Sequence, residues 1–265
     1  MSASVLGHTS VSASSVNQLP ARQPAQGPGS GNLVDGLRAG DTLLVFISWD
    51  HHVPSNSRAV VSLVDGGPHS DEYTEVSAAR PQSSSPTSWG HVFRKTVSSP
   101  ADEEGRSIYV RPLSGTTATS PSLSTNSLNV HVIALREVGS ISVTESDTVT
   151  GVRQVPGGAA GLPGAEGIQI AMNIDHSGSP GTGSGPGFEP LRSTSGSNTA
   201  LQTLQRRVFP GALQVPPDGM SELTSSGHGH SRVLFCSTGG AGIARTRSRR
   251  SLGTQVIGSR SRDFL

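Results

Sequence analysis

Three apolar segments constrain the fold of this chain more than any other feature: Ala39–Asp50, Leu128–Val138 and Gly167–Ile174. All three are rich in β-branched and large aliphatic residues, which favour strands. In the third segment the apolar side chains occupy every second position, at Ile168, Ile170, Met172 and Ile174. A period of two is typical of a strand with one buried face. No helical pattern of comparable strength occurs, so the sequence predicts an all-β protein.

The first of these segments has apolar residues on both faces of the expected strand. They are Leu43, Val45, Ile47 and Trp49 on one side and Leu44 and Phe46 on the other. A strand of this kind is expected in the middle of a sheet, with other parts of the protein covering both sides.

Clusters of Gly, Pro, Ser and Asp separate the apolar segments from shorter strand candidates. We therefore predict an antiparallel β-sandwich, jelly-roll or Ig-like, with long Gly/Ser/Pro-rich loops and one or two packed lobes. The expected organisation is an N-terminal arm and Pro/Gly-rich linker over residues 1–38, a first β-sandwich lobe over 39–150, and a second β lobe with Arg-rich C-terminal strands over 151–265. Residues 5–15 suit either a first strand or an arm lent to a neighbour. We expect residues 1–32 and 239–265 to carry much of the contact with neighbouring chains, so removal of the first 32 residues should leave a folded domain that fails to assemble.

The composition argues against several classes of protein. The net charge of +1 gives no general attraction to nucleic acid or to a membrane surface, and Lys95 is the only lysine among 20 basic residues. No apolar run is long enough for a membrane span. Residues 1–15 lack the basic stretch and continuous apolar core of a secretory signal. Cys236 is the only cysteine, which excludes an intrachain disulfide, and its apolar neighbours predict a small buried hydrophobe.

Candidate metal ligands are limited to histidines. In an extended segment His228 and His230 can point to the same side, and imidazole binds transition metals. Two ligands do not complete a site, so two solvated histidines are the alternative, and we predict no cofactor apart from this candidate metal. Asp50, His51 and His52 could add ligands or a base at the end of the first apolar segment, but a solvated strand end is the stronger expectation. The remaining histidines show no ligand spacing: His8, His69, His91, His131 and His176.

Basic residues gather in the C-terminal segment, at Arg245, Arg247, Arg249, Arg250, Arg260 and Arg262. A basic arm can neutralise phosphate groups of nucleic acid. The segment has no interleaved aromatics for base stacking, however, and its alternation with Ser and Thr is typical of a solvated strand face. We therefore interpret Arg245, Arg247, Arg249 and Arg250 as assembly contacts and predict no nucleic-acid-binding residues.

The sequence gives no support for enzymatic activity, so we predict a protein without catalytic residues. Acidic residues cluster at Asp71–Glu72 and at Asp102–Glu104, where boundaries of strands or loops suggest solvated side chains. Phosphate-binding and nucleophile-elbow motifs are absent. The larger aromatic residues could form a sugar-binding platform if exposed, but core positions are the stronger expectation: Trp49, Trp89, Tyr73, Tyr109 and Phe93.

Three short motifs resemble the β-sandwich virion proteins of tailed bacteriophages and related prophages, which are described as minor tail or tail-fibre-like proteins. They are the opening strand Ala39–Val45, the strand Val132–Arg136 and the turn Pro216–Met220. The resemblance extends over residues 40–265, and Gly67 and Pro68 replace the Pro-x-Gly-Trp turn of the family. The spacing of His228 and His230 also resembles the His-x-His iron sites at the tips of some trimeric phage fibres.

The resemblance implies a structural virion protein that assembles through loops and terminal arms as a component of the tail or fibre. Its expected partners are copies of itself, which would form a homo-oligomer, and other virion structural proteins, with no membrane partner. Its expected location is the virion, after assembly in the host cytoplasm. Two alternatives remain open: a capsid decoration protein and a receptor- or glycan-binding module that contacts the host surface.

Overall fold

The computed structural model describes residues 3–27, 33–51, 60–64, 73–79, 87–113, 125–147, 154–155, 167–175, 189–194, 201–209, 220–222 and 229–237. Within these residues the chain forms fifteen strands and one short helix: β1 (Ser4–Val16), β2 (Leu19–Arg22), β3 (Thr42–His51), β4 (Val60–Val64), β5 (Thr74–Ala79), β6 (Thr87–Thr96), α1 (Pro100–Glu103), β7 (Ser107–Leu113), β8 (Thr125–Arg136), β9 (Ser140–Asp147), β10 (Gln154–Val155), β11 (Gly167–Asp175), β12 (Glu189–Thr194), β13 (Leu201–Phe209), β14 (Met220–Glu222) and β15 (Gly229–Ser237).

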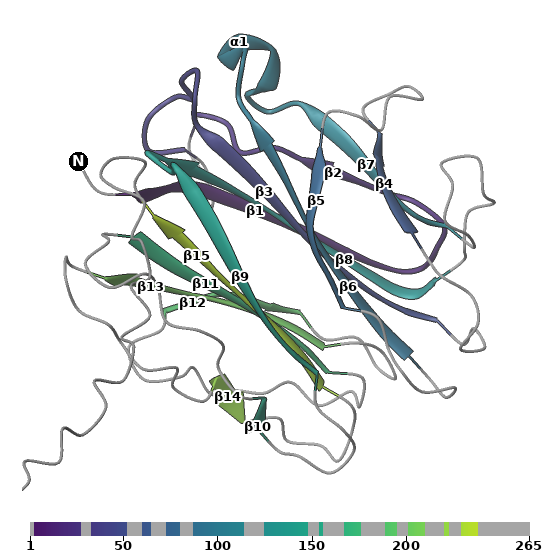
Figure 1. The fold of residues 1–265 in the computed structure, drawn as a ribbon. Coiled ribbons are helices and arrows are strands. Elements are labelled where there is room, and N and C mark those ends of the chain that lie inside the picture. Colours follow the sequence, from purple (N-terminus) through teal and green to yellow (C-terminus); the bar gives the residue numbers. More distant parts are fainter. Residues whose placement is uncertain are drawn as a thin grey trace, which may run out of the picture.

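The strands are arranged in three main layers (Figure 1). A central sheet has the strand order β1-β8-β3-β6-β5, an outer sheet has the order β12-β13-β11-β15-β9, and a three-stranded sheet has the order β2-β7-β4. The strands β10 and β14 form a separate pair. Every pairing between strands is antiparallel. The predicted all-β, antiparallel sandwich is therefore confirmed.

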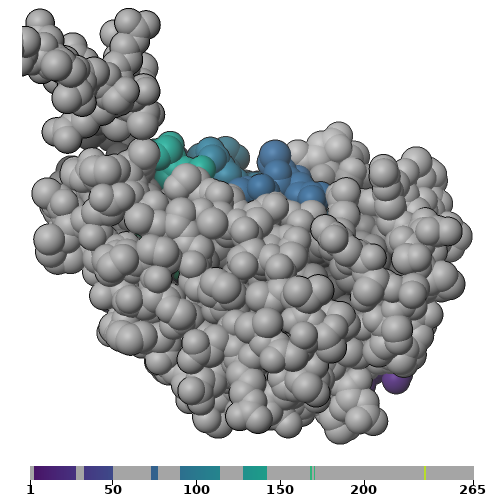
Figure 2. Space-filling view, turned by 60° about the horizontal axis from the view of Figure 1, so that its bottom comes forward, coloured from purple at the N-terminus to yellow at the C-terminus, as the bar shows by residue number. Residues whose placement is uncertain are grey.

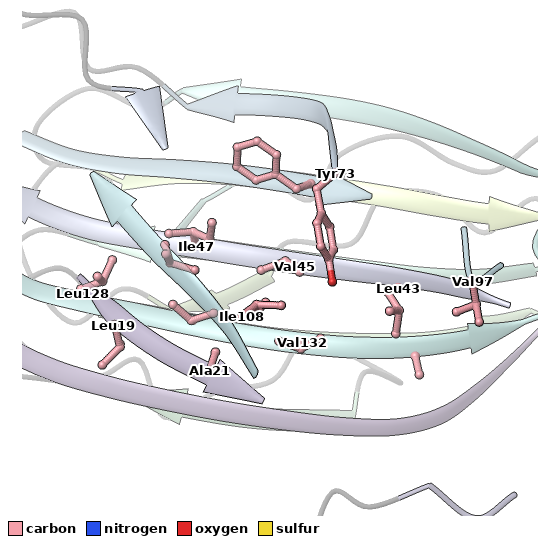
Figure 3. Packing of buried hydrophobic residues seen from close by; sticks show 14 of the residues in the cluster. Leu19, Ala21, Leu43, Val45, Ile47, Tyr73, Val97, Ile108, Leu128 and Val132 are labelled. Atoms are coloured by element: carbon pink, nitrogen blue, oxygen red, sulfur yellow. The ribbon is translucent and has the colours of Figure 1, made fainter. Parts of the chain in front are cut away.

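The central sheet is buried on both faces, as the sequence of β3 predicts. One face of β3 contributes Leu43, Val45, Ile47 and Trp49 to a core shared with β2 and β7, where Leu19, Ala21, Ile108 and Val110 are buried. Figure 3 labels Leu43, Val45 and Ile47 of β3 with Leu19, Ala21 and Ile108 opposite them, and shows the ring of Tyr73 extending toward this core. Because apolar side chains stand on both faces of β3, neither face of this strand can be turned to water without a large free-energy cost.

The other face of the central sheet packs against the outer sheet. From the central sheet, Leu44, Phe46, Val92, Ile133 and Leu135 enter this second core. From the outer sheet, Ile168, Ile170 and Cys236 enter it, and all three are fully buried. The prediction that Cys236 is a small buried hydrophobe is confirmed.

The N-terminal segment forms strands of the sheets, so of the two alternatives for residues 5–15 the first strand is confirmed. β1 pairs with β8 along its length, from Ser4 opposite Arg136 to Val16 opposite Thr125. β2 pairs with β7, and Leu6 and Leu19 are both buried in the first core. Removal of the first 32 residues would therefore expose the edge of β8 and part of the first core.

The boundary expected at residue 150 is crossed by strand pairing. β9 lies before it, yet β9 pairs with β15 from Ser140 opposite Ser237 to Asp147 opposite His230. The outer sheet thus takes strands from both expected lobes, and its inner face packs directly on the central sheet. Among the described residues no helix is long and apolar enough to cross a membrane.

Candidate functional site

Several interacting charged and polar side chains lie around α1, a short helix at one end of the central sheet (Figure 1). Pro100 occupies the first turn of α1, where a missing N–H costs nothing. Gly105 ends the turn with φ of +70°, and a Cβ at this position would lie 3.2 Å from Cβ of Ala25. The N–H of Gln23 donates to the carbonyl of Arg106 at 2.9 Å. The segment after β2 is thereby held against the segment after α1.

The centre of this end is a buried carboxylate, Glu103. Its Oε1 lies 2.6 Å from Nζ of Lys95, at the end of β6, and its Oε2 lies 3.8 Å from Nη1 of Arg106. The amide Nε2 of Gln23 donates to Oε2 of Glu103 at 3.2 Å and also to the hydroxyl of Tyr73. Lys95 Nζ lies 5.5 Å from the centroid of the Tyr73 ring. We refer to Gln23, Tyr73, Lys95, Glu103 and Arg106 as the Glu103 network.

The Glu103 network is largely shielded from water. The side chain of Glu103 is 3% exposed and that of Lys95 is 10% exposed. Gln23 is 1% exposed, and its Oε1 has no hydrogen-bond partner among the described residues. A buried carboxylate is tolerated when cations and hydrogen-bond donors surround it, and the network supplies both.

The next carboxylate, Glu104, holds two loops together. Its Oε1 accepts a hydrogen bond from the N–H of Gln26 at 2.8 Å, and its Oε2 accepts one from the N–H of Leu37 at 3.3 Å. Gln26 and Leu37 lie outside the strands, and Glu104 supplies a hydrogen-bond acceptor to each N–H. The role of Glu104 in the described structure is therefore to fix backbone.

Arg136, at the end of β8, forms a forked ion pair with Asp41. Its Nε donates to Oδ1 of Asp41 at 3.1 Å, and its Nη2 donates to Oδ2 at 3.0 Å. Nη2 also donates to the carbonyl of Gly36 at 2.7 Å, and Nη1 lies 3.4 Å from Asp35. The hydrogen bond to Asp41 raises the pKa of Arg136 above its ordinary value, so the guanidinium stays charged.

Two histidines that are far apart in the sequence meet on the central sheet. Nε2 of His8, on β1, lies 3.2 Å from Nδ1 of His131, on β8, and the rings are stacked with 13° between their planes. The strand register explains this meeting, because His8 pairs opposite Ile133, two residues from His131. The sequence spacing of the histidines gave no sign of this contact, since it depends on which strands are neighbours.

A third histidine, His91, is buried in the aromatic part of the first core. Its ring stacks between those of Trp49 and Phe93, with centroid separations of 5.1 Å and 5.9 Å. Its Nδ1 lies 3.6 Å from Oε1 of Glu75, on β5. The neighbours of His91 are those of a core side chain.

A hollow of about 440 Å³ opens beside the paired ends of β5 and β6, lined by Thr74, Glu75, Val76, Arg94, Lys95 and Thr96. Figure 2 shows the blue atoms of the β5 segment at the surface in this region. The lining carries both signs of charge and no aromatic side chain. Its chemistry suits a small polar ligand better than an apolar one.

Most of the site residues that the sequence suggested lie outside the described residues. His228 and the four arginines, Arg245, Arg247, Arg249 and Arg250, lie outside the described residues. His230 lies in β15 opposite Ile174 and Asp147, and its side chain is not among those described. Across the described ranges, no group of three or more His, Cys, Asp or Glu residues could hold a metal ion.

The expectation that Asp102, Glu103 and Glu104 are all solvated is wrong for Glu103. Asp102 is exposed and accepts a hydrogen bond from Oγ of Ser99 at 2.6 Å, whereas Glu103 is buried. The difference arises because Lys95 and Gln23 converge on Glu103 from β6 and from the segment after β2. The acidic run itself carries no sign of either partner.

The core assignment of the aromatic residues is confirmed for Trp49, Tyr73 and Phe93, which are all buried. These three rings cannot present a flat face to a sugar. Tyr109 is half-buried, and the side chain of Trp89 lies outside the described side chains. The exposed large hydrophobic residue found among the described side chains is Val34.

Two apolar cores and the ion pairs of Glu103 and Asp41 thus hold the sheets together, with the Glu103 network at the end that carries α1. Comparison of the chain with protein-family models, with curated proteins and with solved structures found no match.

Proposed function

We propose that the protein is a structural component of a tailed-phage virion, associated with the tail or a tail fibre, and that it has no enzymatic activity. In this proposal it packs against copies of itself and against other virion proteins. Its short motifs at Ala39–Val45 and Val132–Arg136 resemble such proteins; the first leads into the central strand β3 and the second ends the central strand β8.

The observation that carries the proposal is the use of charged groups inside the fold. Glu104 accepts hydrogen bonds from two backbone N–H groups, and Asp41 and Arg136 pair with each other. Side chains committed in this way hold the scaffold and are poorly placed to act on a substrate. A fold whose charged side chains hold its own backbone in place suits a protein that acts by packing against neighbours in an assembly.

Open strand edges offer a means of assembly. Within the described residues, each of the three larger sheets ends in strands that pair on one side: β1 and β5, β12 and β9, and β2 and β4. An edge strand can accept a strand from another chain through backbone hydrogen bonds. Symmetric repetition then turns many weak contacts into a stable particle.

The C-terminal segment remains our candidate for a contact arm. Arg245, Arg247, Arg249 and Arg250 are proposed to bind acidic or carbonyl groups of a neighbouring virion protein, because a guanidinium donates several hydrogen bonds in a fixed fork. A protein lacking residues 239–265 should keep its circular dichroism spectrum and fail to enter particles. A matched variant with the four arginines changed to lysine keeps the charge and tests whether the fork is needed.

The location is tested by gold-antibody labelling of particles purified from the producing organism. Label over tails or fibres supports the proposal. Label distributed over heads favours the capsid decoration protein. Abundant soluble protein with unlabelled particles contradicts a virion role, and the glycan-binding alternative would then be tested at the polar hollow with Arg94→Ala. The proposed His228 and His230 metal is tested by elemental analysis of the assembled particle.

A further inference from the structure

The Glu103 network brings together the three groups needed to form an amide bond between side chains. Lys95 supplies a primary amine, Gln23 supplies a carboxamide, and Glu103 supplies a carboxylate that contacts both. Lys95 is also the only lysine of the chain, since its other 19 basic residues, histidines aside, are arginines. An arginine at this position would keep the charge but could not serve as a nucleophile, because its guanidinium stays protonated.

Glu103 is placed to transfer protons between the other two groups. Its Oε1 lies 2.6 Å from Lys95 Nζ, and its Oε2 accepts a hydrogen bond of 3.2 Å from Gln23 Nε2. A carboxylate only accepts hydrogen bonds, so it fixes the orientation of the Gln23 amide with the nitrogen toward Glu103. Each carboxylate oxygen therefore faces one of the two nitrogens that would exchange places on the amide carbon.

The burial of the network favours a reaction between its side chains, because little water is present to solvate their charges. Gln23 is 1% exposed, Glu103 is 3% exposed, and Tyr73 receives a hydrogen bond from the same amide nitrogen of Gln23. Water is thus largely excluded, and groups held in one geometry react as an intramolecular pair. The buried Oε1 of Gln23, which lacks a hydrogen-bond partner among the described residues, belongs to the carbonyl that would be attacked.

We infer that Lys95 and Gln23 become joined by an isopeptide bond, with Glu103 as the catalytic residue. Lys95 gives one proton to Glu103, and the neutral amine attacks Cδ of Gln23. The Nζ–Cδ bond forms and the Cδ–Nε2 bond breaks. The two protons that Lys95 loses are relayed through Glu103 to the departing nitrogen, which leaves as ammonium. The carboxylate is regenerated, and the reaction consumes no oxidant or cofactor.

The bond would connect the segment after β2 to the end of β6, and so join the three-stranded sheet to the central sheet. The single cysteine excludes an intrachain disulfide, so this link would be a covalent staple that works without thiols. The inference goes beyond the proposed virion role and does not depend on it.

The test is the mass of the full-length wild-type protein, purified after expression and measured under denaturing conditions. The expected mass is lighter than the sequence mass by one ammonia molecule. Trypsin should release residues 23–38 joined to residues 95–106, because a lysine in an amide bond is no longer cleaved. Fragmentation of this pair should place the bond between Gln23 and Lys95. This test depends on no variant, so a folding defect cannot obscure it.

Variants then assign the roles. Lys95→Arg and Glu103→Gln should have the full sequence mass, whereas Gln26→Ala, which removes the neighbouring glutamine of the same peptide, should still lose one ammonia. A folded wild-type protein at its full sequence mass overturns the inference. A bond that maps to Gln26, or a mass loss that persists in Glu103→Gln, overturns the assignment of residues.

Discussion

At the scale of single residues, buried charges in this protein are held by partners from distant parts of the chain. Asp41 is 3% exposed and lies 95 positions from Arg136, which forms two hydrogen bonds to its carboxylate. A forked pair of this kind has a fixed geometry and is stronger than a single contact. Removing one member would leave the other charge shielded from water and without its main partner.

Substitution of Arg136 should therefore destabilise the fold. We expect Arg136→Ala to lower the free energy of unfolding by about 2–3 kcal/mol, because Asp41 stays buried after its cation is lost. Arg136→Lys should recover part of this loss, since it restores the charge without the fork. Urea denaturation gives the free energy of unfolding of each variant. Arg38→Ala, at an exposed side chain of the same loop, is the control, and an equal loss in Arg38→Ala would contradict the role of the pair.

The buried thiol of Cys236 should make the free energy of unfolding decrease at alkaline pH. Burial raises the pKa of its thiol from 9.0 to about 12, while the positive charge of Arg94 acts in the opposite direction. Above pH 9 the unfolded chain releases the thiol proton and the folded protein keeps it. Stability should therefore fall as pH rises from 9 toward 12, by at most about 1.4 kcal/mol per pH unit.

The contribution of Cys236 is isolated by comparison with Cys236→Ala. Other groups titrate in the same pH range, so the measured quantity is the difference between the two unfolding free energies at each pH. This difference should shrink as the pH increases, because the variant has no buried thiol. A difference that is constant from pH 8 to pH 11 would show that the thiol ionises equally in both states.

At the scale of elements, β3 depends on packing at both of its faces. Leu43 points into the core shared with β2 and β7, and the next residue, Leu44, points into the core shared with the outer sheet. Both side chains are fully buried. In a sheet with one solvated face, adjacent residues of a strand would differ strongly in their contribution to stability.

We therefore expect Leu43→Ala and Leu44→Ala to be similarly costly, each lowering the free energy of unfolding by about 2–5 kcal/mol. Val34→Ala is the matched control at an exposed aliphatic residue, with an expected change within about 0.5 kcal/mol. Equilibrium denaturation gives all three values. A small effect of either leucine substitution would mean that one face of β3 is not packed.

The sequence of β3 predicted its central place, whereas the sequence of β1 did not. The apolar positions of β3 are fully buried on both faces, so burial leaves a strong pattern. β1 lies at the edge of the central sheet and includes a β-bulge between Val5 and Gly7. Its residues are mostly half-buried, and the bulge interrupts the period of two, which weakens the pattern.

The polar end around α1 could not be read from the sequence for a different reason. The residues of the Glu103 network come from β6, from the segment after β2 and, for Tyr73, from just before β5. Local patterns describe neighbours in sequence, and these neighbours arise from strand order. The meeting of His8 and His131 has the same origin. Lys95 is the only lysine of the sequence, but that fact alone predicts no site and no partner.

At the scale of the whole molecule, the central sheet is shared by the two cores. The first core includes Trp49, and the second includes Cys236 from the outer sheet. Loss of either layer would expose one apolar face of the central sheet to water. The two cores should therefore be lost together, even though their residues come from both sides of residue 150.

This coupling predicts one cooperative unfolding transition, which two probes can follow separately. In a Trp89→Phe background Trp49 is the sole tryptophan, and its fluorescence reports on the first core. Pulsed alkylation of Cys236, the sole cysteine, reports on the second core. We expect the same denaturant midpoint from both probes, as two-state unfolding requires. Alkylation of Cys236 at a lower denaturant concentration than the change in fluorescence would show instead that the outer sheet unfolds separately, as two independent lobes would.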